Sequence, residues 1–313
     1  MTPPLARFFG RGTRTVRSRG RAGAARLRPA EAAERLERLR GLDGVGRTLA
    51  GALRRRLPPG PAADVLHGVP LGQPAHPGLS GMSLGFWTSA ALLDLIPHSE
   101  RAARALIAAG VASTAPATLT GLADWSVLHT EQQRVGMAHA AASAAASAFF
   151  CASLVARSAG HPRGGKALSF TGLAVAGLGG YLGGHLSFRL AAGANHAESV
   201  AHLAPLGWHD LCRLAELPDG RPVRRELGYI NLLVLRDGSS VSALADRCAH
   251  LGGPLHQGEL VTSSGHRCVR CPWHGSTFRI SDGSVRRGPA TARQPAFETR
   301  VSDGGIVQVR PRS

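Results

Sequence analysis

The sequence contains few cysteines, and their positions exclude a disulfide framework. Among its 313 residues there are five cysteines. Two of them, Cys248 and Cys271, belong to Cys/His motifs described below. The other three are Cys151, Cys212 and Cys268, an odd number at unrelated positions. No set of paired bridges of the kind that stabilises small secreted domains is therefore expected.

Signals for secretion and for common organic cofactors are also missing. The first 56 residues lack an apolar core followed by a small-residue cleavage site, so no secretory signal peptide is expected. No convincing flavin or nicotinamide fingerprint is present either. The nearest pattern, Gly177-Leu178-Gly179-Gly180, lies within an apolar run and is interpreted as a helix-packing motif.

Positive charge is concentrated at one end of the chain. The formal net charge is +17, and residues 1–56 hold fifteen arginines against four acids. Leucines at helical spacing between Pro29 and Leu57, with Arg54-Arg55-Arg56 near the end, predict an amphipathic helix suited to anionic lipid headgroups. An ordinary solvated charged helix is the alternative. Nucleic acid is the less favoured partner because long apolar stretches follow this arm.

Four apolar stretches follow a Pro58-Pro59-Gly60-Pro61 break. Each approaches the roughly 20 residues that a helix needs to span hydrocarbon, and charges sit mainly at their ends. Small residues along them would allow close helix packing in lipid, which predicts a four-helix transmembrane bundle, with a soluble Ala-rich bundle as the alternative. The four stretches are Leu79 to Ile96, Ala105 to Ala123, Gly136 to Ala156 and Leu168 to Leu190.

Two Cys/His motifs dominate the last third of the chain. Cys248 is followed by His250, and Cys271 is followed by His274. Two thiolates and two imidazoles from two loops suit either a zinc ion or an iron–sulfur cluster. The zinc alternative needs the four ligands but not the glycine, proline and serine residues that follow each pair. The motifs read Cys248-Ala249-His250-Leu251-Gly252-Gly253-Pro254-Leu255 and Cys271-Pro272-Trp273-His274-Gly275-Ser276-Thr277-Phe278.

These two segments closely resemble the cluster-binding loops of Rieske 2Fe-2S proteins. The resemblance implies one cluster per chain, with Cys248 and Cys271 on one iron and His250 and His274 on the other. It implies that the histidine-bound iron is the one reduced and that the outer imidazole nitrogens face solvent or a partner. It also implies that the Gly288-Pro289-Ala290 turn covers the cluster. Amides of Gly252, Gly253 and Gly275 and the Ser276 hydroxyl are candidate hydrogen-bond donors to the sulfurs.

The resemblance is to the ferredoxin type of Rieske domain. High-potential members of the family carry an extra disulfide-forming cysteine in each loop, and Gly253 and Trp273 stand at those positions here. A complete Rieske oxygenase is not expected, because that family needs a large following domain with a mononuclear iron site and this sequence ends at Ser313.

The apolar part resembles a bacterial four-helix membrane domain of unknown function that is sometimes fused to a Rieske domain. This resemblance covers about residues 62–195 and implies no established activity; Gln73 stands where the family usually has histidine. The residues that carry it are Leu66-His67-Gly68, Leu71-Gly72-Gln73-Pro74-Ala75-His76-Pro77, Leu93-Asp94, Thr120-Gly121-Leu122-Ala123-Asp124-Trp125 and Gly180-Tyr181-Leu182-Gly183-Gly184-His185-Leu186.

The C-terminal part predicts an all-β domain. Runs of Val and Leu alternate with Asp-Gly turns, and strands are expected near 229–235, 241–245, 266–270, 276–280, 297–301 and 305–309. The expected organisation is a basic arm with an amphipathic helix at 1–60, the membrane domain at 61–195, a linker at 196–207 and the Rieske domain at 208–313.

Histidines within the apolar stretches suggest a second site. His139 and His185 would lie at similar depth in antiparallel helices, with His76 on the same face. Ionisable residues in membrane helices are functional candidates, so this trio is a candidate site for a b-type haem or a quinone headgroup. The alternative is that these histidines only bridge helices by hydrogen bonds or lie among lipid headgroups.

Three functional hypotheses follow. The first is a membrane-anchored carrier of single electrons between donor and acceptor proteins or a membrane acceptor. The second is a quinone-linked reductase or the reductase component of an oxygenase, although no substrate site is visible. The third is a redox or iron–sulfur sensor. The chain is expected in the cell membrane as a multi-pass protein with the Rieske domain on the cytoplasmic side, because the arginine-rich arm favours that side.

Overall fold

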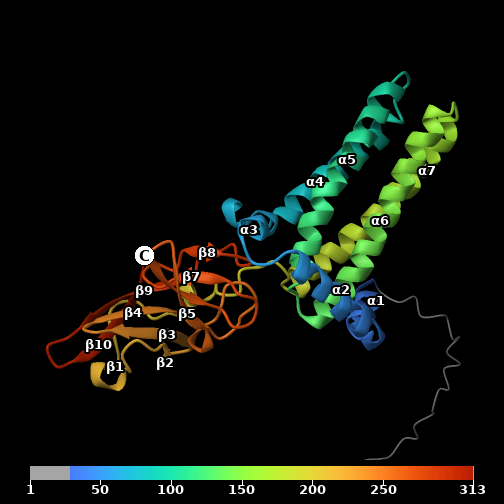
Figure 1. Ribbon diagram of the computed structural model, residues 1–313. Helices are drawn as coiled ribbons and strands as arrows, with labels where there is room; N and C mark the ends of the chain where they lie inside the picture. The colour runs from blue at the N-terminus through green and yellow to red at the C-terminus, as the bar shows by residue number, and fades with distance from the viewer. Residues whose placement is uncertain (1–28, 313) are drawn as a thin grey trace, which may run out of the picture.

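The computed structural model describes residues 29–312, which form a helical region followed by a β domain. Figure 1 shows the two lying next to each other, with helix α3 at the boundary and helices α1 and α2 at the base of the long helices. This order of an α-helical part and an all-β part confirms the predicted fold class. Residues 1–28 of the basic arm lie outside the described residues.

The prediction of one continuous amphipathic helix from Pro29 to Leu57 is wrong. It is divided into α1 (Pro29–Glu37) and α2 (Asp43–Arg56) by a 3-10 turn at Arg40–Leu42. Asp43 pairs through both carboxylate oxygens with Arg134, at 2.6 and 2.9 Å, and Arg134 also donates to the Glu37 carbonyl. The break therefore lets the chain turn around one arginine and pack α1 and α2 onto α6 (Thr130–Ser158).

Four long helices do form, at the places where the apolar stretches predict them. They are arranged as two antiparallel hairpins, α4 with α5 and α6 with α7, and α7 continues into a π-helical turn at His185–Arg189. The remaining elements of this region are short: α3 (Pro61–His67), a 3-10 turn at Val69–Leu71 and α8 (Val200–Leu203). The long helices are α4 (Ala75–Leu93), α5 (Glu100–Trp125), α6 (Thr130–Ser158) and α7 (Pro162–Gly184).

Three of these helices are long and apolar enough to cross a membrane, which corrects the predicted number of four. The three are Glu100–Trp125, Thr130–Ser158 and the continuous Pro162–Arg189. Helix α4 carries no charged side chain, but its glycine, serine, histidine and proline residues lower its mean hydropathy. At 19 residues it is about 28 Å long, so it still matches the length of its neighbours' apolar segments.

Small residues let the long helices approach one another. The Trp87 ring stacks on Phe150 with centroids 4.2 Å apart, and it lies against Gly110, where a Cβ would be 2.4 Å from the indole nitrogen. At the end far from the β domain, Arg157 forms a bidentate ion pair with Asp94 at 2.8 and 2.5 Å, and both side chains are buried. The bundle is thus held by a few specific contacts between closely packed backbones.

The β domain contains two antiparallel sheets. One has the order β1-β10-β9-β4-β3-β2 and the other β5-β6-β7-β8. All six predicted strands are present, and β1, β2, β5 and β8 were not predicted. The strands are β1 (His209–Arg213), β2 (Val223–Leu227), β3 (Ile230–Asp237), β4 (Ser240–Ala245), β5 (Glu259–Ser263), β6 (His266–Arg270), β7 (Thr277–Arg279), β8 (Val285–Arg287), β9 (Ala296–Val301) and β10 (Ile306–Pro311).

The two Cys/His motifs lie in loops at ends of these strands. The first loop follows β4, which is central in the larger sheet, and the second connects β6 to β7 in the smaller sheet. Within this larger sheet, residues 232–235 of β3 and Leu244 of β4 are almost completely buried. Since both loops leave from well-packed strands, their starting positions are fixed by the domain core.

Candidate metal centre

The two loops have the same backbone hydrogen-bond pattern. In the first, Cys248 N–H donates to the Gly253 carbonyl and Gly252 N–H donates to the Cys248 carbonyl, both at 2.9 Å. In the second, Cys271 N–H donates to the Ser276 carbonyl at 2.8 Å and Gly275 N–H to the Cys271 carbonyl at 3.1 Å. Gly252 and Gly275 both have positive φ, at 79° and 80°, which glycine adopts without strain. Each motif therefore folds into the same tight turn around its cysteine.

The two thiols lie next to each other. Cys248 and Cys271 are 1% and 3% exposed, and the Cys248 thiol hydrogen-bonds to the Cys271 sulfur. That bond, with amide donors from Trp273 and His274, lowers the pKa of Cys271 to about 7. The same contact and burial raise the pKa of Cys248, although amides of His250 and Leu251 donate to its sulfur. The site therefore stabilises negative charge on the Cys271 sulfur, as a thiolate metal ligand requires.

The amides that reach the cysteine sulfurs do not include two of the predicted glycines, Gly252 and Gly275. The prediction named the amides of Gly252, Gly253 and Gly275 and the Ser276 hydroxyl. The cysteine carbonyls accept the N–H groups of Gly252 and Gly275. The donors to the cysteine sulfurs are instead His250 and Leu251 in one loop and Trp273 and His274 in the other. The reason is geometric, since the glycines close the turn while the residues inside the turn point their amides at sulfur.

The two imidazoles form a second pair. The ring centroids of His250 and His274 are 5.1 Å apart, with an angle of 85° between the ring planes. Burial lowers the pKa of His274 to about 4, and His129 and Arg54 add to this effect. Burial and the neighbouring His274 also hold the pKa of His250 well below its usual value. Both rings are therefore neutral near pH 7, which is the form that binds a metal.

The geometry fits a binuclear cluster better than a single ion. The four motif residues form a thiol pair and an imidazole pair. A tetrahedral zinc site would bring all four ligands to one point, whereas a cluster with two cysteines and two histidines needs one pair per iron.

The loops are joined by packing where related domains have a disulfide. A Cβ at Gly253 would lie 2.9 Å from the Cys271 sulfur and 3.0 Å from the Trp273 ring. The Trp273 side chain thus lies directly on the backbone of the first loop. Glycine at 253 and tryptophan at 273 are complementary, and this contact joins the two loops without a covalent bond.

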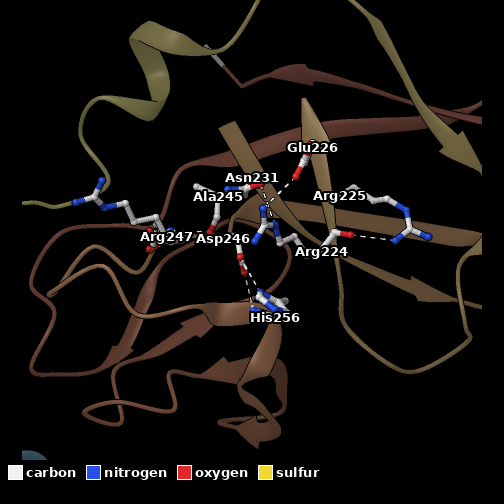
Figure 2. Close-up of polar contacts among 9 residues, drawn as sticks. Arg224, Arg225, Glu226, Asn231, Ala245, Asp246, Arg247 and His256 are labelled. Carbon is white, nitrogen blue, oxygen red and sulfur yellow. Dashed lines mark hydrogen bonds and ion pairs between the residues drawn. The ribbon is translucent and has the colours of Figure 1, made fainter. Parts of the chain in front are cut away.

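Two polar residues that the sequence did not reveal support the first loop. Asp246, two residues before Cys248, is buried and accepts hydrogen bonds from the backbone N–H and the ring Nδ1 of His256, both at 2.7 Å (Figure 2). This pairing leaves the His256 side chain only 22% exposed. Gln294, 1% exposed, accepts from Ala249 N–H and donates to the Ala245 and Arg247 carbonyls.

The turn at residues 288–290 is attached to both parts of the molecule. Ala290 N–H donates to the Ser276 hydroxyl oxygen at 3.0 Å, so the turn is held on the second loop. Asp64 of α3 accepts from Gly288 N–H at 2.8 Å and pairs with Arg287 at 2.7 Å. The carboxylate of a helical-region residue therefore holds the turn that the sequence placed over the cluster.

The imidazole pair faces the helical region of the same chain. The ring of His129, the N-cap residue of α6, lies 6.4 Å from the His274 ring and 5.7 Å from the Trp273 ring, centroid to centroid. His250 lines a cavity together with His67 of α3 and Asp124 of α5. The sequence predicted that solvent or a separate partner faces the two imidazoles. On the side of the helical region, residues of the same chain lie there instead.

The three histidines of the predicted second site are brought together in part. His76 of α4 donates from Nδ1 to the Ala117 carbonyl, and His139 of α6 donates from Nδ1 to the Gly179 carbonyl, both at 2.8 Å. Their ring centroids are 5.9 Å apart. His185 instead pairs through Nε2 with Glu37 of α1 at 2.7 Å. All three make the interhelical hydrogen bonds of the simpler alternative, and only His76 and His139 contact each other.

Comparison with known proteins identifies the class of the β domain. A model of the Rieske 2Fe-2S domain matches residues 207–298. Apoptosis-inducing factor 3 of Mus musculus is 35% identical over 91 residues, which are 29% of this chain and 14% of that protein. The cytochrome b6-f complex iron-sulfur subunit of Chlorobaculum tepidum is 26% identical over 93 residues, 30% of this chain and 48% of that protein.

A solved structure, the ferredoxin of carbazole 1,9a-dioxygenase from Nocardioides aromaticivorans IC177, is 27% identical with a TM-score of 0.31, covering 34% of this chain and 98% of that one. The chain spans less than half the length of each of the two relatives above. The fold and the two loops define an iron–sulfur domain. Residues 207–298 are a Rieske 2Fe-2S domain, as the two Cys/His motifs indicated. Such a domain implies a 2Fe-2S cluster.

Proposed function

We propose that this protein is a membrane-anchored carrier of single electrons whose Rieske cluster exchanges electrons across the boundary with its own helical region. The observation that carries the proposal is the direction of the imidazole pair. His250 and His274 face His129, His67 and Asp124 of the helical region. Relatives of the domain include an iron-sulfur subunit of a cytochrome b6-f complex, which supports a role in electron transfer.

In this proposal Cys248 and Cys271 hold one iron, and His250 and His274 hold the other. A 2Fe-2S cluster with two imidazole ligands supplies a one-electron couple at a higher potential than an all-cysteine cluster. The residues of the chain keep the Cys271 thiol acidic, keep the imidazoles neutral and exclude water. Hydrogen bonds from the amides of residues 250, 251, 273 and 274 stabilise the charge on the cysteine sulfurs.

The helical region is proposed to anchor the protein in the bilayer. Large apolar side chains such as Leu119, Val155 and Leu178 are 58%, 69% and 56% exposed on the long helices. Lipid would cover these side chains, and the uncharged α4 would pack beside the three apolar helices. Exposed Val45 and Leu49 on α2, close to Arg54–Arg56, fit an anionic lipid surface better than nucleic acid.

The first test is spectroscopic, on detergent-purified protein loaded with iron and sulfide. The reduced protein should give the electron paramagnetic resonance spectrum and broad, weak visible bands of a cluster with two imidazole ligands. Purified protein should exchange electrons with a donor protein at a rate that depends on that partner. Substrate turnover by the pure protein would instead support the reductase hypothesis, and redox-dependent binding without turnover the sensor hypothesis.

A b-type haem or a quinone at the membrane histidines is the second part of the proposal. Because His76 and His139 each use Nδ1 to bond a neighbouring helix, each keeps Nε2 available for a ligand. Sharp haem bands in a reduced-minus-oxidised spectrum that disappear in His139→Ala would support the haem. His185→Ala serves as the control, because that residue pairs with Glu37. A spectrum without sharp bands would leave only the quinone.

The proposed orientation places the Rieske domain in the cytoplasm. Tyr229 is 93% exposed at the β2–β3 turn, and His161 is exposed at the opposite end of the bundle. In a background carrying Cys151→Ala and Cys212→Ser, an impermeant thiol reagent on intact cells should label His161→Cys and not Tyr229→Cys. The opposite labelling pattern would reverse the orientation.

A further inference from the structure

One arginine of the helical region is fixed near the second cluster loop. Arg54 lies in the last turn of α2, and its Nη1 donates to the Ser126 carbonyl at 2.5 Å. Ser126 is the C-cap of α5, and three residues later His129 caps the start of α6. The ring centroid of His129 lies 6.4 Å from that of His274. The bond to Ser126 therefore holds the Arg54 guanidinium at the helix junction that faces the second loop.

The positive charge of Arg54 is not cancelled by this bond. Its partner is a carbonyl, which is neutral, whereas Arg134 and Arg157 are paired with carboxylates. Burial is the main cause of the lowered pKa of His274, and repulsion from His129 and Arg54 adds to it. A cation that disfavours positive charge on this imidazole also favours negative charge at the same place.

The two sides of α2 have different surroundings. Val45 and Leu49 are exposed and form the apolar face that we propose lies on lipid. Arg56 is seven residues after Leu49 and so falls on that same face, because about 3.6 residues make one turn. Arg54 is five residues after Leu49, which places it about 140° around the helix. Lipid on the apolar face therefore leaves the Arg54 charge on the other side of α2.

Reduction of a 2Fe-2S cluster adds one negative charge to its site. In the proposed arrangement the electron goes to the iron held by His250 and His274, and His274 is the ligand nearest to the Arg54 junction. A positive charge at this place stabilises the reduced state and so raises the reduction potential. Both histidines are only partly exposed, so water screens the charge less than it would at an open surface.

We propose that Arg54 sets the reduction potential of the cluster, because its fixed positive charge, held by the Ser126 carbonyl beside the second loop, stabilises the reduced state. The inference rests on the proposed electron-carrier function and adds a residue that regulates it. It gives α2 two functions, since one face lies on lipid and the other carries the cation that acts on the cluster. The helical region then contributes to the redox properties of the Rieske domain as well as to its anchoring.

The test is a charge series at position 54, measured on the full-length, cluster-loaded protein in micelles of an uncharged detergent. A redox titration followed by electron paramagnetic resonance gives the midpoint potential of each variant. Arg54→Lys keeps the charge and should keep most of the potential. Arg54→Gln should lower the potential, and Arg54→Glu should lower it about twice as much, because the charge changes by two units instead of one. Each fall should shrink as the salt concentration rises, because salt screens a charge that acts through space.

Arg56→Gln and Arg56→Glu are the matched controls, since they make the same charge changes on the lipid-facing side of α2. Their midpoint potentials should equal that of the unaltered protein. The circular dichroism of the helices and the line shape of the reduced cluster should be the same in every variant, so that a shift in potential is not a loss of structure. If Arg54→Glu does not assemble the cluster, Arg54→Lys and Arg54→Gln still decide the test.

Three results would overturn the inference. They are a potential that is constant across the Arg54 series, an equal fall in the Arg56 series, and a fall in Arg54→Lys as large as that in Arg54→Gln. A cluster-loaded protein that exchanges electrons with a donor but whose potential does not depend on residue 54 would leave the carrier proposal standing. Failure of the unaltered protein to assemble a cluster would remove the carrier proposal itself, and this inference with it.

Discussion

The helical region and the Rieske domain are stabilised in different ways. In the Rieske domain, large side chains such as Leu232, Leu244 and Phe278 are fully buried, and loops are fixed by hydrogen bonds. In the helical region the buried positions are mainly small, such as Ala90, Ala103 and Ala146. Many of its large apolar side chains point outward. The first part carries its own core, and the second depends on its surroundings to cover apolar surface.

The difference extends to polar groups. The Rieske domain uses polar residues to shape its loops, as Asp246 and Gln294 do beside the first motif. The helical region uses them to join helices, as Asp94 and Arg157 do at one end and His76 and His139 do nearer the other. Damage to a loop should therefore affect the cluster, whereas damage to a helix contact should affect the bundle.

The largest expected effect is that of Cys271→Ser. Because this thiol is hydrogen-bonded to Cys248 and to two loop amides, its loss should abolish cluster assembly while the helices remain intact. Iron content and electron paramagnetic resonance measure the cluster, and far-ultraviolet circular dichroism measures the helices. Cys268→Ala is the matched control, since Cys268 is equally buried but lies in β6 outside the loop. Equal loss of the cluster in both variants would contradict the ligand assignment.

The next effect is confined to the helical region. Arg157→Ala leaves the buried Asp94 carboxylate without its partner, which should cost about 3–5 kcal/mol of stability. Helix unfolding in detergent should move to a lower temperature while the cluster spectrum at low temperature stays unchanged. Arg189→Ala is the control. Its pair with Glu34 is largely exposed, so that change should cost less than about 1 kcal/mol. An equal effect of the two substitutions would show that the buried pair is not specific.

The sequence predicted most of the Rieske domain because its signals are local. Cysteine, histidine and glycine at fixed spacing define a turn, and Asp-Gly pairs mark strand ends, so both loops and six strands were foreseen. Strand β1 was missed because its neighbour, β10, lies about a hundred residues away along the chain. Strand β8 was missed because it is only three residues long. Tertiary pairing rather than local preference defines such strands.

Prediction was less complete for the groups that act between parts of the chain. Helix length and apolarity revealed the long helices, but periodicity could not show that α1 and α2 are separated around Arg134. The Asp64–Arg287 pair joins residues more than two hundred positions apart, and no local pattern relates them. The same holds for His129 beside His274. These contacts depend on how two domains dock, which a single sequence does not encode locally.

A smaller effect is expected where the two loops touch. Gly253→Ala would place a methyl group 2.9 Å from the Cys271 sulfur and 3.0 Å from the Trp273 ring. Overpacking of this kind costs about 1–3 kcal/mol, so the cluster should be lost at a lower temperature. Gly304→Ala is the control because the nearest atom to its new methyl group is 3.9 Å away. The double variant Gly253→Ala with Trp273→Ala should recover part of the loss. No recovery would mean that the sulfur contact alone is responsible.

The smallest effect tests the junction between the two parts. Asp64→Asn weakens the contacts to Arg287 and to Gly288 N–H, and since the Arg287 side chain is 43% exposed the cost should be about 1 kcal/mol. Global unfolding should change little. Hydrogen exchange of the amides at Gly288 and Ala290 should become several-fold faster, because local opening of the turn needs less energy than unfolding.

The matched control for the junction is Glu259→Gln, which removes an exposed pair with Arg270 inside the Rieske domain and should leave the turn protected. Faster exchange in Asp64→Asn together with an unchanged cluster spectrum would show that the helical region holds the turn without setting the electronic structure of the cluster. If the spectrum changes as well, the turn contributes to the cluster environment and the two parts are more strongly coupled than their separate cores suggest. Unchanged exchange would show that Ser276, which accepts from Ala290 N–H, holds the turn alone.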